Sequence, residues 1–330
     1  MDKNKTFNIL FTSAGRRVSL IRYFREALTN LGLTGHIVAT DMNKAAAALH
    51  VSDSYEEVPP VVDSGYISRL MDICLKYDIR LVIPLIDTEL LLLAIHKREF
   101  QKMGATFLVS SIRANEICSD KRKTYAFFKK IGIETPEIFN YADMLKAGPS
   151  AYPVLLKPKN GSASIGVTKI RDKRELAFFK ARIRNSIIQE FVTGEEYTLD
   201  ILADLHGKVR SVVPRLRIET RAGEVSKGMT VKNQAIIALG KKVVESLPGA
   251  FGCITVQCFL TSNGNVKFIE INPRFGGGFP LAYKAGANFP RWIIEMLLGK
   301  NSDISIDGWQ DGLVMLRYDE GIFITREMIL

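Results

Sequence analysis

The segment from Cys253 to Arg274 restricts the fold more than any other stretch of the 330-residue chain. Two apolar runs, 254–260 and 266–272, flank the dipeptide Asn263-Gly264. That dipeptide is typical of a type I′ turn, in which both central residues have positive φ, so the segment predicts a tight β-hairpin. A turn centred on the dipeptide also fixes which residues of the two strands lie opposite each other.

Three oxygen-bearing side chains are expected on one face of this hairpin. The register places Gln257 opposite Glu270, and alternation along a strand puts Asn272 on the same face as Glu270. Magnesium prefers a few hard oxygen ligands of this kind, completed by phosphate and water. A carboxylate flanked by Ile269 and Ile271 is seldom buried unless it is paired or metal-bound. An amphipathic strand with its polar face in water is the alternative.

A loop of small residues follows a second predicted strand. The strand 154–157 ends at Lys157 and runs into 158–167, which contains Gly161 and Ser162. Backbone N–H groups of such a loop can surround phosphate oxygens, and the lysine supplies the positive charge that a triphosphate requires. The segment does not have the Walker A spacing, so a glycine-serine loop without a ligand is the competing interpretation.

A third short strand, 186–192, precedes an acidic turn. Backbone groups at Glu190 and Val192 are placed to read the edge of an adenine, and the carboxylate of Glu196 is placed to accept from ribose hydroxyls. A solvated acidic turn is the alternative. This segment therefore indicates a nucleotide site only in combination with the others.

Positive charge and glycines follow the hairpin. Arg274 comes directly after Pro273, where its guanidinium could neutralise charge on a transferring phosphoryl group. The glycines at 276–278 permit close backbone approach to a ligand, and a plain flexible loop is the competing account. Four further basic residues could line an acidic-substrate pocket or lie in solvent: Arg215, Arg217, Arg221 and Lys227.

Residues 1 to 115 predict a small parallel α/β unit. An apolar strand at 7–11, a small-residue turn and a helical pattern from Val18 begin it, and strand and helix patterns alternate afterwards. Asp41 ends the second strand, where a dinucleotide-binding fold carries its ribose-binding acid. Gly15 is the single glycine of the first turn, so the glycine fingerprint of a nicotinamide site is missing and a Rossmann oxidoreductase is disfavoured.

Composition narrows the class of protein further. The longest apolar stretch, 81–95, contains charged residues and a proline, so we expect no membrane helix, and the first residues do not form a signal-peptide core. We therefore expect a cytoplasmic protein. Scattered cysteines argue against a zinc site or a disulfide framework. The formal net charge of +10 is dispersed, which favours an anionic small molecule over nucleic acid as the partner.

In this order, the segments resemble the ATP-grasp superfamily, and most closely the ATP-grasp units of carbamoyl-phosphate-synthase large-chain-like proteins. The matching motifs are Ser119-Asp120-Lys121 before a helix ending near Gly132, Lys157-Pro158 with its loop, Gln189-Glu190-Phe191-Val192, Glu196, Gln257, and Phe268-Ile269-Glu270-Ile271-Asn272-Pro273-Arg274. The resemblance implies an α/β and α+β architecture. A Rossmann-like pre-ATP-grasp domain at 1–115 would precede a two-lobed ATP-grasp fold, with the small lobe at 116–188 and the large lobe at 189–330.

The resemblance also implies a role for each motif. ATP and Mg²⁺, or Mn²⁺, would bind between the two lobes. The implied contacts are Lys121, Lys157, Gly161 and Ser162 for the phosphates, Glu190, Phe191 and Val192 for the adenine, Glu196 for the ribose, Gln257, Glu270 and Asn272 for the metal, and Arg274 for the reacting groups.

One departure bears on the reaction. The stretch 221–226 lacks the histidine that similar proteins carry at the bicarbonate site, and the chain has one ATP-grasp unit where a synthase large chain has two. The sequence therefore predicts a stand-alone ATP-dependent carboxylate–amine ligase that acts through an acylphosphate on small-molecule acids and amines, and that could form a homodimer. A carboxyphosphate-forming subunit and a non-catalytic ATP sensor are the alternatives.

Overall fold

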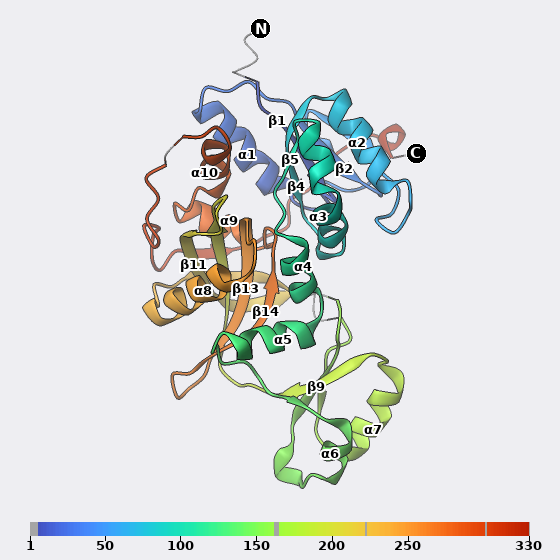
Figure 1. The fold of residues 1–330 in the computed structure, drawn as a ribbon, viewed down its shortest axis with the longest axis vertical. Coiled ribbons are helices and arrows are strands. Elements are labelled where there is room, and N and C mark those ends of the chain that lie inside the picture. The colour runs from blue at the N-terminus through green and yellow to red at the C-terminus, as the bar shows by residue number, and fades with distance from the viewer. Residues whose placement is uncertain (1–5, 162–164, 222, 301, 330) are drawn as a thin grey trace.

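Three β-sheets organise the chain in the computed structural model, which describes residues 6–161, 165–221, 223–300 and 302–329. Figure 1 shows the first sheet (strands within residues 8–107) with its helices at one end of the long axis. The second sheet (strands within residues 138–190) lies with its helices at the other end, and the third sheet lies between them. Within the described ranges, no helix combines the length and the apolar character needed to cross a bilayer.

The first sheet is parallel, with the strand order β3-β2-β1-β4-β5. Its elements are β1 (Asn8–Thr12), α1 (Val18–Asn30), β2 (Ile37–Asp41), the short 3₁₀ helix η2 (Leu49–Val51), β3 (Ser54–Glu57), α2 (Tyr66–Lys76), β4 (Ile79–Pro84), α3 (Asp87–Lys102) and β5 (Thr106–Phe107). Alternation along β1 places Ile9 and Phe11 in one core cluster with α1, and Leu10 in another with α2 and α3. Helices therefore cover both faces, and the predicted Rossmann-like unit is confirmed.

The turn after β1 uses Asp41 as a structural residue. The backbone N–H of Gly15 donates to Asp41 Oδ2 at 2.9 Å, and the N–H of Asn43 donates to Oδ1 at 3.0 Å. The carboxylate that a dinucleotide fold would use for a ribose therefore closes two turns of the backbone here.

The second sheet is antiparallel, with the order β6-β9-β7-β8. Its elements are β6 (Ile138–Phe139), α6 (Tyr141–Lys146), η3 (Pro149–Ala151), β7 (Val154–Pro158), β8 (Thr168–Ile170), α7 (Lys173–Arg182) and β9 (Ser186–Glu190). Val154, Leu156 and Ile188 form a small core of their own with residues of α6 and α7. The expected lobe boundary at 188/189 falls inside β9, and the domain limits stay predictions.

The third sheet has the order β14-β13-β10-β11-β12-β15. The remaining elements are α4 (Ile112–Ser119), α5 (Lys121–Lys130), β10 (Glu195–Ala203), β11 (Val209–Arg221), β12 (Glu224–Thr230), α8 (Gln234–Ser246), β13 (Gly252–Leu260), β14 (Val266–Asn272), α9 (Phe279–Lys284), α10 (Phe289–Leu297), β15 (Val314–Leu316) and η4 (Arg326–Met328). Leu199 and Ile201 of β10 belong to the core that includes α8, whereas Thr198 and Asp200 point to the opposite face. That opposite face carries the site.

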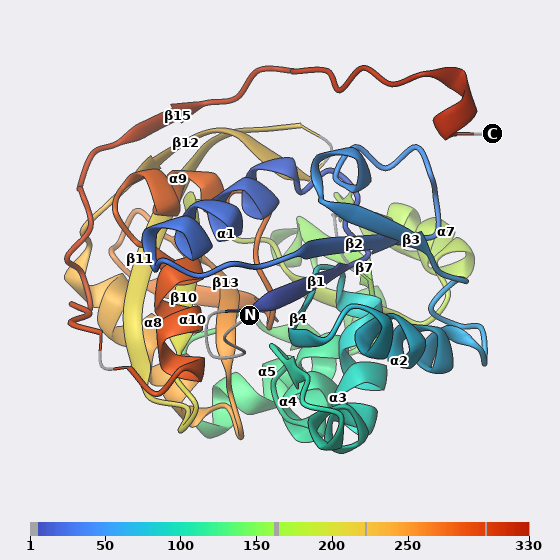
Figure 2. The same ribbon diagram turned by 90° about the horizontal axis from the view of Figure 1, so that it is seen from above.

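Helix α5 connects the sheets. Phe128 lies in the same core cluster as Phe268 of β14, with ring centroids 6.0 Å apart, so α5 packs on the third sheet. The helix begins at the predicted position, with the Asp120 side chain accepting from the N–H of Arg122, and Gly132 follows it with a φ of +64°. The chain after β15 runs as an extended segment past the outer side of α1 (Figure 2), where Glu320 pairs with Arg22.

The turn between β13 and β14 differs from the predicted type I′ turn. Gly264 has a φ of +84°, but Asn263 does not have the positive φ that a type I′ turn requires. The N–H of Thr261 donates to the carbonyl of Asn265, and the N–H of Gly264 donates to the carbonyl of Thr261, both at 2.9 Å. The predicted turn type is therefore wrong: the loop is one residue longer, with glycine in the left-handed region.

A β-bulge on β14 cancels the effect of the longer turn. Cys258 pairs with Phe268, one residue out of the predicted register, whereas Gln257 pairs with Glu270 as predicted. The extra residue is Ile269, and it lines the same cavity as Gln257 and Glu270. The hairpin therefore presents Gln257 and Glu270 together, as predicted. The sequence predicts a different type of turn and does not predict the bulge.

Candidate active site

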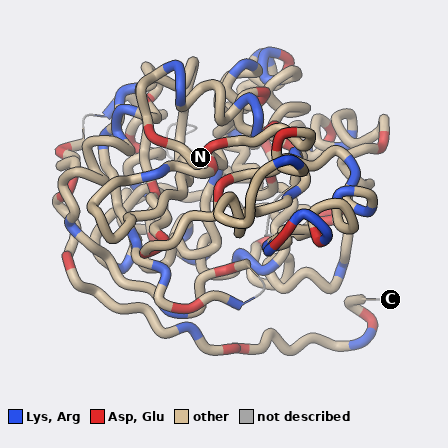
Figure 3. Tube along the Cα trace, turned by 90° about the horizontal axis from the view of Figure 1, so that it is seen from below, with Lys and Arg blue, Asp and Glu red and all other residues tan. Residues whose placement is uncertain are grey.

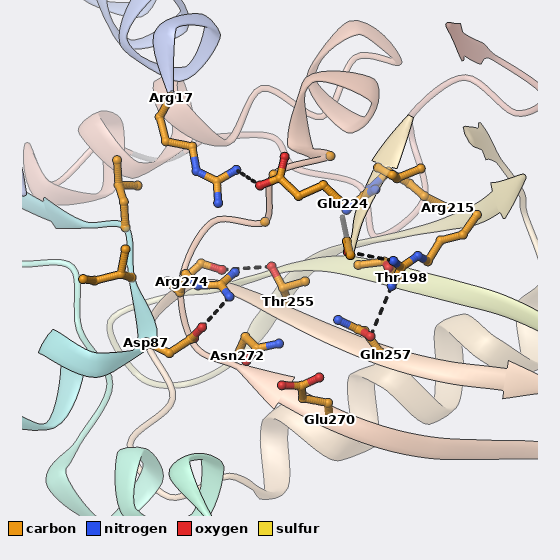
Figure 4. Close-up of a pocket in the computed structure, with 18 of the residues that line it drawn as sticks. Arg17, Asp87, Thr198, Arg215, Glu224, Thr255, Gln257, Glu270, Asn272 and Arg274 are labelled. Carbon is orange, nitrogen blue, oxygen red and sulfur yellow. Dashed lines mark hydrogen bonds and ion pairs between the residues drawn. The ribbon is translucent and has the colours of Figure 1, made fainter. Parts of the chain in front are cut away.

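Three cavities meet at one carboxylate, because Glu270 lines all of them. We call them the loop cavity (about 190 Å³; Lys121, Lys157, Gly161, Glu196, Gln257), the arginine cavity (about 380 Å³; Arg17, Arg215, Arg217, Arg274) and the apolar cavity (about 350 Å³; Leu90, Leu91, Cys118, Ile271, Pro273). Figure 4 shows the arginine cavity, with Glu270 at its edge. The site is therefore a junction rather than a single pocket.

The loop cavity combines charged and apolar walls. Lys121, Lys157 and Gly161 come from the side of the predicted phosphate loop, and Glu196, Gln257 and Glu270 come from the third sheet. The apolar lining residues are Leu155, Ile165, Val167, Phe259 and Ile269. Such a mixture suits a flat aromatic base joined to an anionic tail. Ser162, also predicted for the phosphates, lies outside the described residues.

Lys157 is a buried cation. Its side chain is 8% exposed, and burial lowers its pKa from 10.5 to about 8. The carboxylate of Glu270 acts in the opposite direction, and the second cation, Lys121, lowers the pKa further. A positive charge that is costly to bury becomes favourable once an anion reaches it.

The start of α5 is tied to the loop. The ammonium of Lys121 donates to the carbonyl of Gly161 at 2.6 Å, and its backbone N–H donates to the carbonyl of Lys159 at 2.9 Å. The Asn160 side chain donates to the carbonyl of Ser119 at 2.8 Å. These contacts tie the described loop residues 159–161 to the start of α5.

Glu196 forms an ion pair with Arg217, one of the four basic residues that the sequence assigns either to an acidic-substrate pocket or to solvent. Arg217 Nη1 lies 2.7 Å from Glu196 Oε1 and donates to Gln257 Oε1 at 3.3 Å, while Nη2 donates to the carbonyl of Gly223 at 2.9 Å. Burial raises the pKa of Glu196, and the adjacent Arg217 opposes that shift. Arg217 therefore links the loop cavity with the arginine cavity, which it also lines.

Arg274 is held by the first α/β unit. Its Nη2 donates to Asp87 Oδ2 at 2.6 Å, and its backbone carbonyl accepts from the Thr255 hydroxyl at 2.9 Å (Figure 4). Asp87 is the first residue of α3, and its negative charge is favoured at a helix N-terminus. The sequence predicts Arg274 beside Glu270; the partner that the structure gives it is Asp87.

The loop that presents Asp87 is fixed by a buried acid. Glu89 is fully buried; its Oε1 accepts from the N–H groups of Leu85 and Ile86 at 2.9 and 3.2 Å, and its Oε2 accepts from the Tyr66 hydroxyl at 2.6 Å. Burial raises the pKa of Glu89. These hydrogen bonds fix the end of β4 relative to the start of α3.

Asn272 lies between two carboxylates. Its amide reaches Glu270 Oε1 and Asp87 Oδ1, each at 3.3 Å, and with the nitrogen turned toward them it donates to both. With the amide turned the other way, the oxygen of Asn272 would face the carboxylate oxygens of Glu270 and Asp87. A cation would then be needed between these three oxygens. No cluster of three or more His, Cys, Asp or Glu suited to a metal occurs among the described residues, so amide oxygens would have to complete the predicted site.

The basic residues of β11 and β12 divide into two groups. Arg215 and Arg217 line the arginine cavity, and Arg215 also forms a buried pair with Asp200, with Nε 2.6 Å from Oδ2. Arg221 and Lys227 pair with Glu219 and lie largely in solvent. Arg215 and Arg217 therefore line a cavity and Arg221 and Lys227 do not, while a role in binding an acidic substrate stays a prediction.

Arg17 and Glu224 join the first unit to the third sheet. They lie 3.8 Å apart at the arginine cavity, and Glu224 also pairs with Arg16 and Arg317. Burial lowers the pKa of Arg17 to about 10, and the nearby guanidinium of Arg274 adds to this shift. The sequence predicts neither Arg17 nor Glu224 for the site, because the chain brings them together from separate elements.

The segment predicted for the adenine lies beside the loop cavity without lining it. The side chain of Glu190 accepts from Lys267 and from the N–H of Glu137, and its own N–H donates to the carbonyl of Glu137. Phe191 stacks under the ammonium of Lys169, 4.0 Å from its ring centroid. The adenine roles of Glu190, Phe191 and Val192 stay predictions.

Family comparisons agree with this arrangement. Residues 118–278 match the ATP-grasp domain, and residues 9–108 match the PylC-like N-terminal domain. The chain therefore carries an ATP-grasp domain preceded by a PylC-like N-terminal domain. The predicted recognition and fold class are confirmed.

Curated relatives and a solved structure point the same way. The vancomycin/teicoplanin A-type resistance protein VanA of Enterococcus faecium is 29% identical over 52% of this chain and 57% of its own length. A carbamoyl-phosphate synthase of Methanobrevibacter smithii is 23% identical over 84% of this chain and 77% of its own length. The biotin carboxylase domain dimer of a Hydrogenobacter thermophilus 2-oxoglutarate carboxylase, solved with MgADP and bicarbonate, superposes with a TM-score of 0.72 at 19% identity, over 91% of this chain and 71% of that one.

Along the trace drawn in Figure 3, Lys and Arg positions are interspersed with Asp and Glu positions. The cytoplasmic location, the homodimer and the absence of nucleic-acid partners stay predictions.

Proposed function

We propose that this chain is an ATP-dependent carboxylate–amine ligase. The single observation that carries the proposal is the position of Glu270 at the junction of three cavities of different chemistry. A ligase of this kind must bring a nucleotide, an acid and an amine to one point. The similarity to ATP-grasp relatives supports ATP and Mg²⁺ as the nucleotide and the metal.

The loop cavity fits ATP. Lys121 and Lys157 supply positive charge for the phosphates, and the buried state of Lys157 makes an arriving anion strongly favourable. The apolar lining from Leu155 to Ile269 suits the base. Mg²⁺ would be held by Glu270, Asn272 and Gln257, and it would supply charge neutralisation at the phosphates.

The arginine cavity fits the carboxylate substrate. Arg274 and Arg217 bring guanidinium groups to the side of Glu270 that faces away from the phosphate loop. The γ-phosphorus forms a bond to a carboxylate oxygen as its bond to the ADP oxygen breaks. The amine nitrogen then bonds to the acyl carbon as inorganic phosphate leaves, and the amine proton passes to that phosphate. Arg274 stabilises the charge that develops on the transferred group.

Trapping the acylphosphate tests the proposal. A panel of carboxylic acids is incubated with ATP, Mg²⁺ and hydroxylamine; we expect ADP and an acyl hydroxamate with the right acid. Release of AMP would overturn the acylphosphate route. ADP formed with bicarbonate alone would favour carboxyphosphate chemistry, and ATP binding without any turnover would favour a sensor.

Glu270→Gln provides the matched variant. It keeps the size and removes the charge at the junction, so ADP release should fall by at least about 10³-fold while the thermal midpoint stays close to that of the parent. Glu320→Gln, in a surface pair with Arg22 at 3.9 Å, should leave the rate unchanged. Equal rates for both variants would contradict a role for Glu270.

A further inference from the structure

The apolar cavity lies on the other side of Asp87 and Asn272 from the arginine cavity. Asp87, Thr88, Glu270 and Asn272 line both cavities and so form the wall between them. Leu90 and Leu91 of α3 face Cys118 of α4 and Ile271 and Pro273 of β14 and its exit. The loop residues Asn160 and Gly161 also line it, so four separate segments build the cavity.

Its charge is opposite to that of the arginine cavity. Among its described lining residues are two carboxylates, Asp87 and Glu270, and no lysine or arginine. Burial raises the pKa of the Cys118 thiol, and the charges of Asp87 and Glu270 raise it further, so the sulfur stays neutral and forms part of the apolar wall. The lining therefore disfavours a second carboxylate, although the guanidinium of Arg274 neutralises part of the charge of Asp87.

Asn115 adds a polar group that lacks a partner. Its side chain is 3% exposed, and its Nδ2 donates to the carbonyls of Ser110 and Ser111, both at 3.0 Å. Its Oδ1 is buried without a hydrogen-bond partner among the described residues, and the side chain lines this cavity. A buried carbonyl oxygen without a donor costs free energy, which an N–H or O–H group of a ligand would recover.

We propose that the apolar cavity binds the amine substrate, and that this substrate carries an apolar side group and at least one further hydrogen-bond donor. The assignment rests on the proposed ligase function. The amino nitrogen lies at the shared wall near Asp87 and Glu270, the apolar group packs against Leu91 and Ile271, and the donor reaches Asn115 Oδ1. The acid and the amine then approach the junction from opposite sides of one wall.

The chemical groups that line the cavity decide which small molecule is used as the probe. Leucinamide has an ammonium, an apolar branched side chain and a neutral amide donor, whereas glycinamide lacks the side chain and aspartate adds negative charge. Leu91 is partly exposed on α3, so Leu91→Trp fills the cavity with little change to the core. Ile95→Trp is the matched control, because Ile95 lies one turn further along α3, is 52% exposed and lines none of the three cavities.

Two measurements separate this inference from the proposed function. First, leucinamide binding to the intact chain without ATP is followed by titration calorimetry; we expect binding to the parent and to Ile95→Trp, and at least tenfold weaker binding to Leu91→Trp. Second, coupling rates with the active acid are compared. Leu91→Trp should raise the KM for leucinamide at least tenfold while hydroxamate formation from small hydroxylamine stays within twofold.

The outcomes distinguish the ligand class from the reaction. Equal leucinamide binding by Leu91→Trp and the parent, or preferred binding of aspartate, overturns the assignment of the cavity. Leucinamide binding that depends on Leu91, without any hydroxamate or ADP, supports the ligand class and rejects the ligase function. Glycinamide binding as tight as that of leucinamide removes the apolar side group from the proposal.

Discussion

Asp87 and Arg274 form an ion pair at 2.6 Å between the first residue of α3 and the residue that follows the exit of β14. The pair joins the PylC-like domain to the ATP-grasp domain at the point where the proposed reaction takes place. Asp87 also reaches the amide of Asn272. The N-terminal domain therefore takes part in orienting both Arg274 and the amide of Asn272.

Asp87→Asn should slow the reaction without weakening ATP binding. The variant keeps the shape but loses the charge that orients Arg274, so kcat for ADP release should fall roughly 10- to 100-fold, with the KM for ATP within about twofold. Asp87→Glu should recover part of the rate. A rise in the KM for ATP with unchanged kcat would place Asp87 in nucleotide binding instead.

Lys157 predicts how stability changes with pH. Its folded-state pKa is about 8 against 10.5 unfolded, so between those values the unfolded chain binds more protons and the free energy of unfolding rises with pH. Lys157→Met should be more stable than the parent at pH 7, by about 3.4 kcal/mol at most, and the difference should shrink as the pH approaches 10.5. Urea titrations across this range measure it, with Lys130→Gln as the exposed control.

ATP affinity should fall as the pH rises, because the same lysine, Lys157, loses its proton. ATP needs Lys157 charged, so above pH 8 the apparent affinity should fall by up to about tenfold per pH unit, until the pKa of the bound state is reached. Lys157→Met should bind ATP weakly and lack this slope. A parental affinity that is flat from pH 7.5 to 9.5 would show that Lys157 does not contact the phosphates.

Gly264 tests the revised turn. Its φ is +84° and nothing lies within 4 Å of the position that a Cβ would take, so Gly264→Ala carries backbone strain without a clash. We expect a loss of about 1 kcal/mol in the free energy of unfolding, with activity intact below the transition. Gly148→Ala, which is equally open but has a φ of −74°, should be neutral.

The glycines after Arg274 should differ in their tolerance of a side chain. A Cβ at Gly278 would overlap Nη1 of the buried Arg215, which the Asp200 pair holds in place, whereas a Cβ at Gly277 would meet the side-chain ends of Arg17 and Glu224 at 2.6 and 2.9 Å. Gly278→Ala should cost about 2–4 kcal/mol in stability, and Gly277→Ala clearly less. Thermal unfolding of the two variants ranks them directly, and the reverse order would contradict the packing.

Local patterns predict the elements well and the site partly. Strand alternation and the Asp120 cap are readable because they depend on neighbouring residues. Lys157 can be found because it lies at the end of a predicted strand, and Glu270 because the hairpin register places it opposite Gln257. Asp87 and Arg17 are not predicted, because each lies in an ordinary turn or helix start. Their place at the site depends on contacts across domains, with Arg274 and Glu224, which the spacing of residues in the sequence does not show.

The structure also limits two of the predicted roles. The sequence predicts that Glu196 accepts from ribose hydroxyls, yet Arg217 lies 2.7 Å away. The sequence around Glu196 in β10 does not show that the neighbouring strand β11 supplies a cation. Glu190 is engaged by Lys267, which comes from the hairpin far along the chain. Long-range charge pairs of this kind decide which carboxylates stay available.

The offsetting turn and bulge in the β13–β14 hairpin separate the length of the tip from the position of the acid. The longer tip leaves one surplus residue on β14, and the bulge at Ile269 absorbs it while Gln257 and Glu270 stay paired. A deletion within the tip would shorten the turn and leave the flanking pairs Leu260–Val266 and Cys258–Phe268 in place. Related chains can therefore differ in the length of this tip and still carry the acidic side chain on the same face of the ribbon.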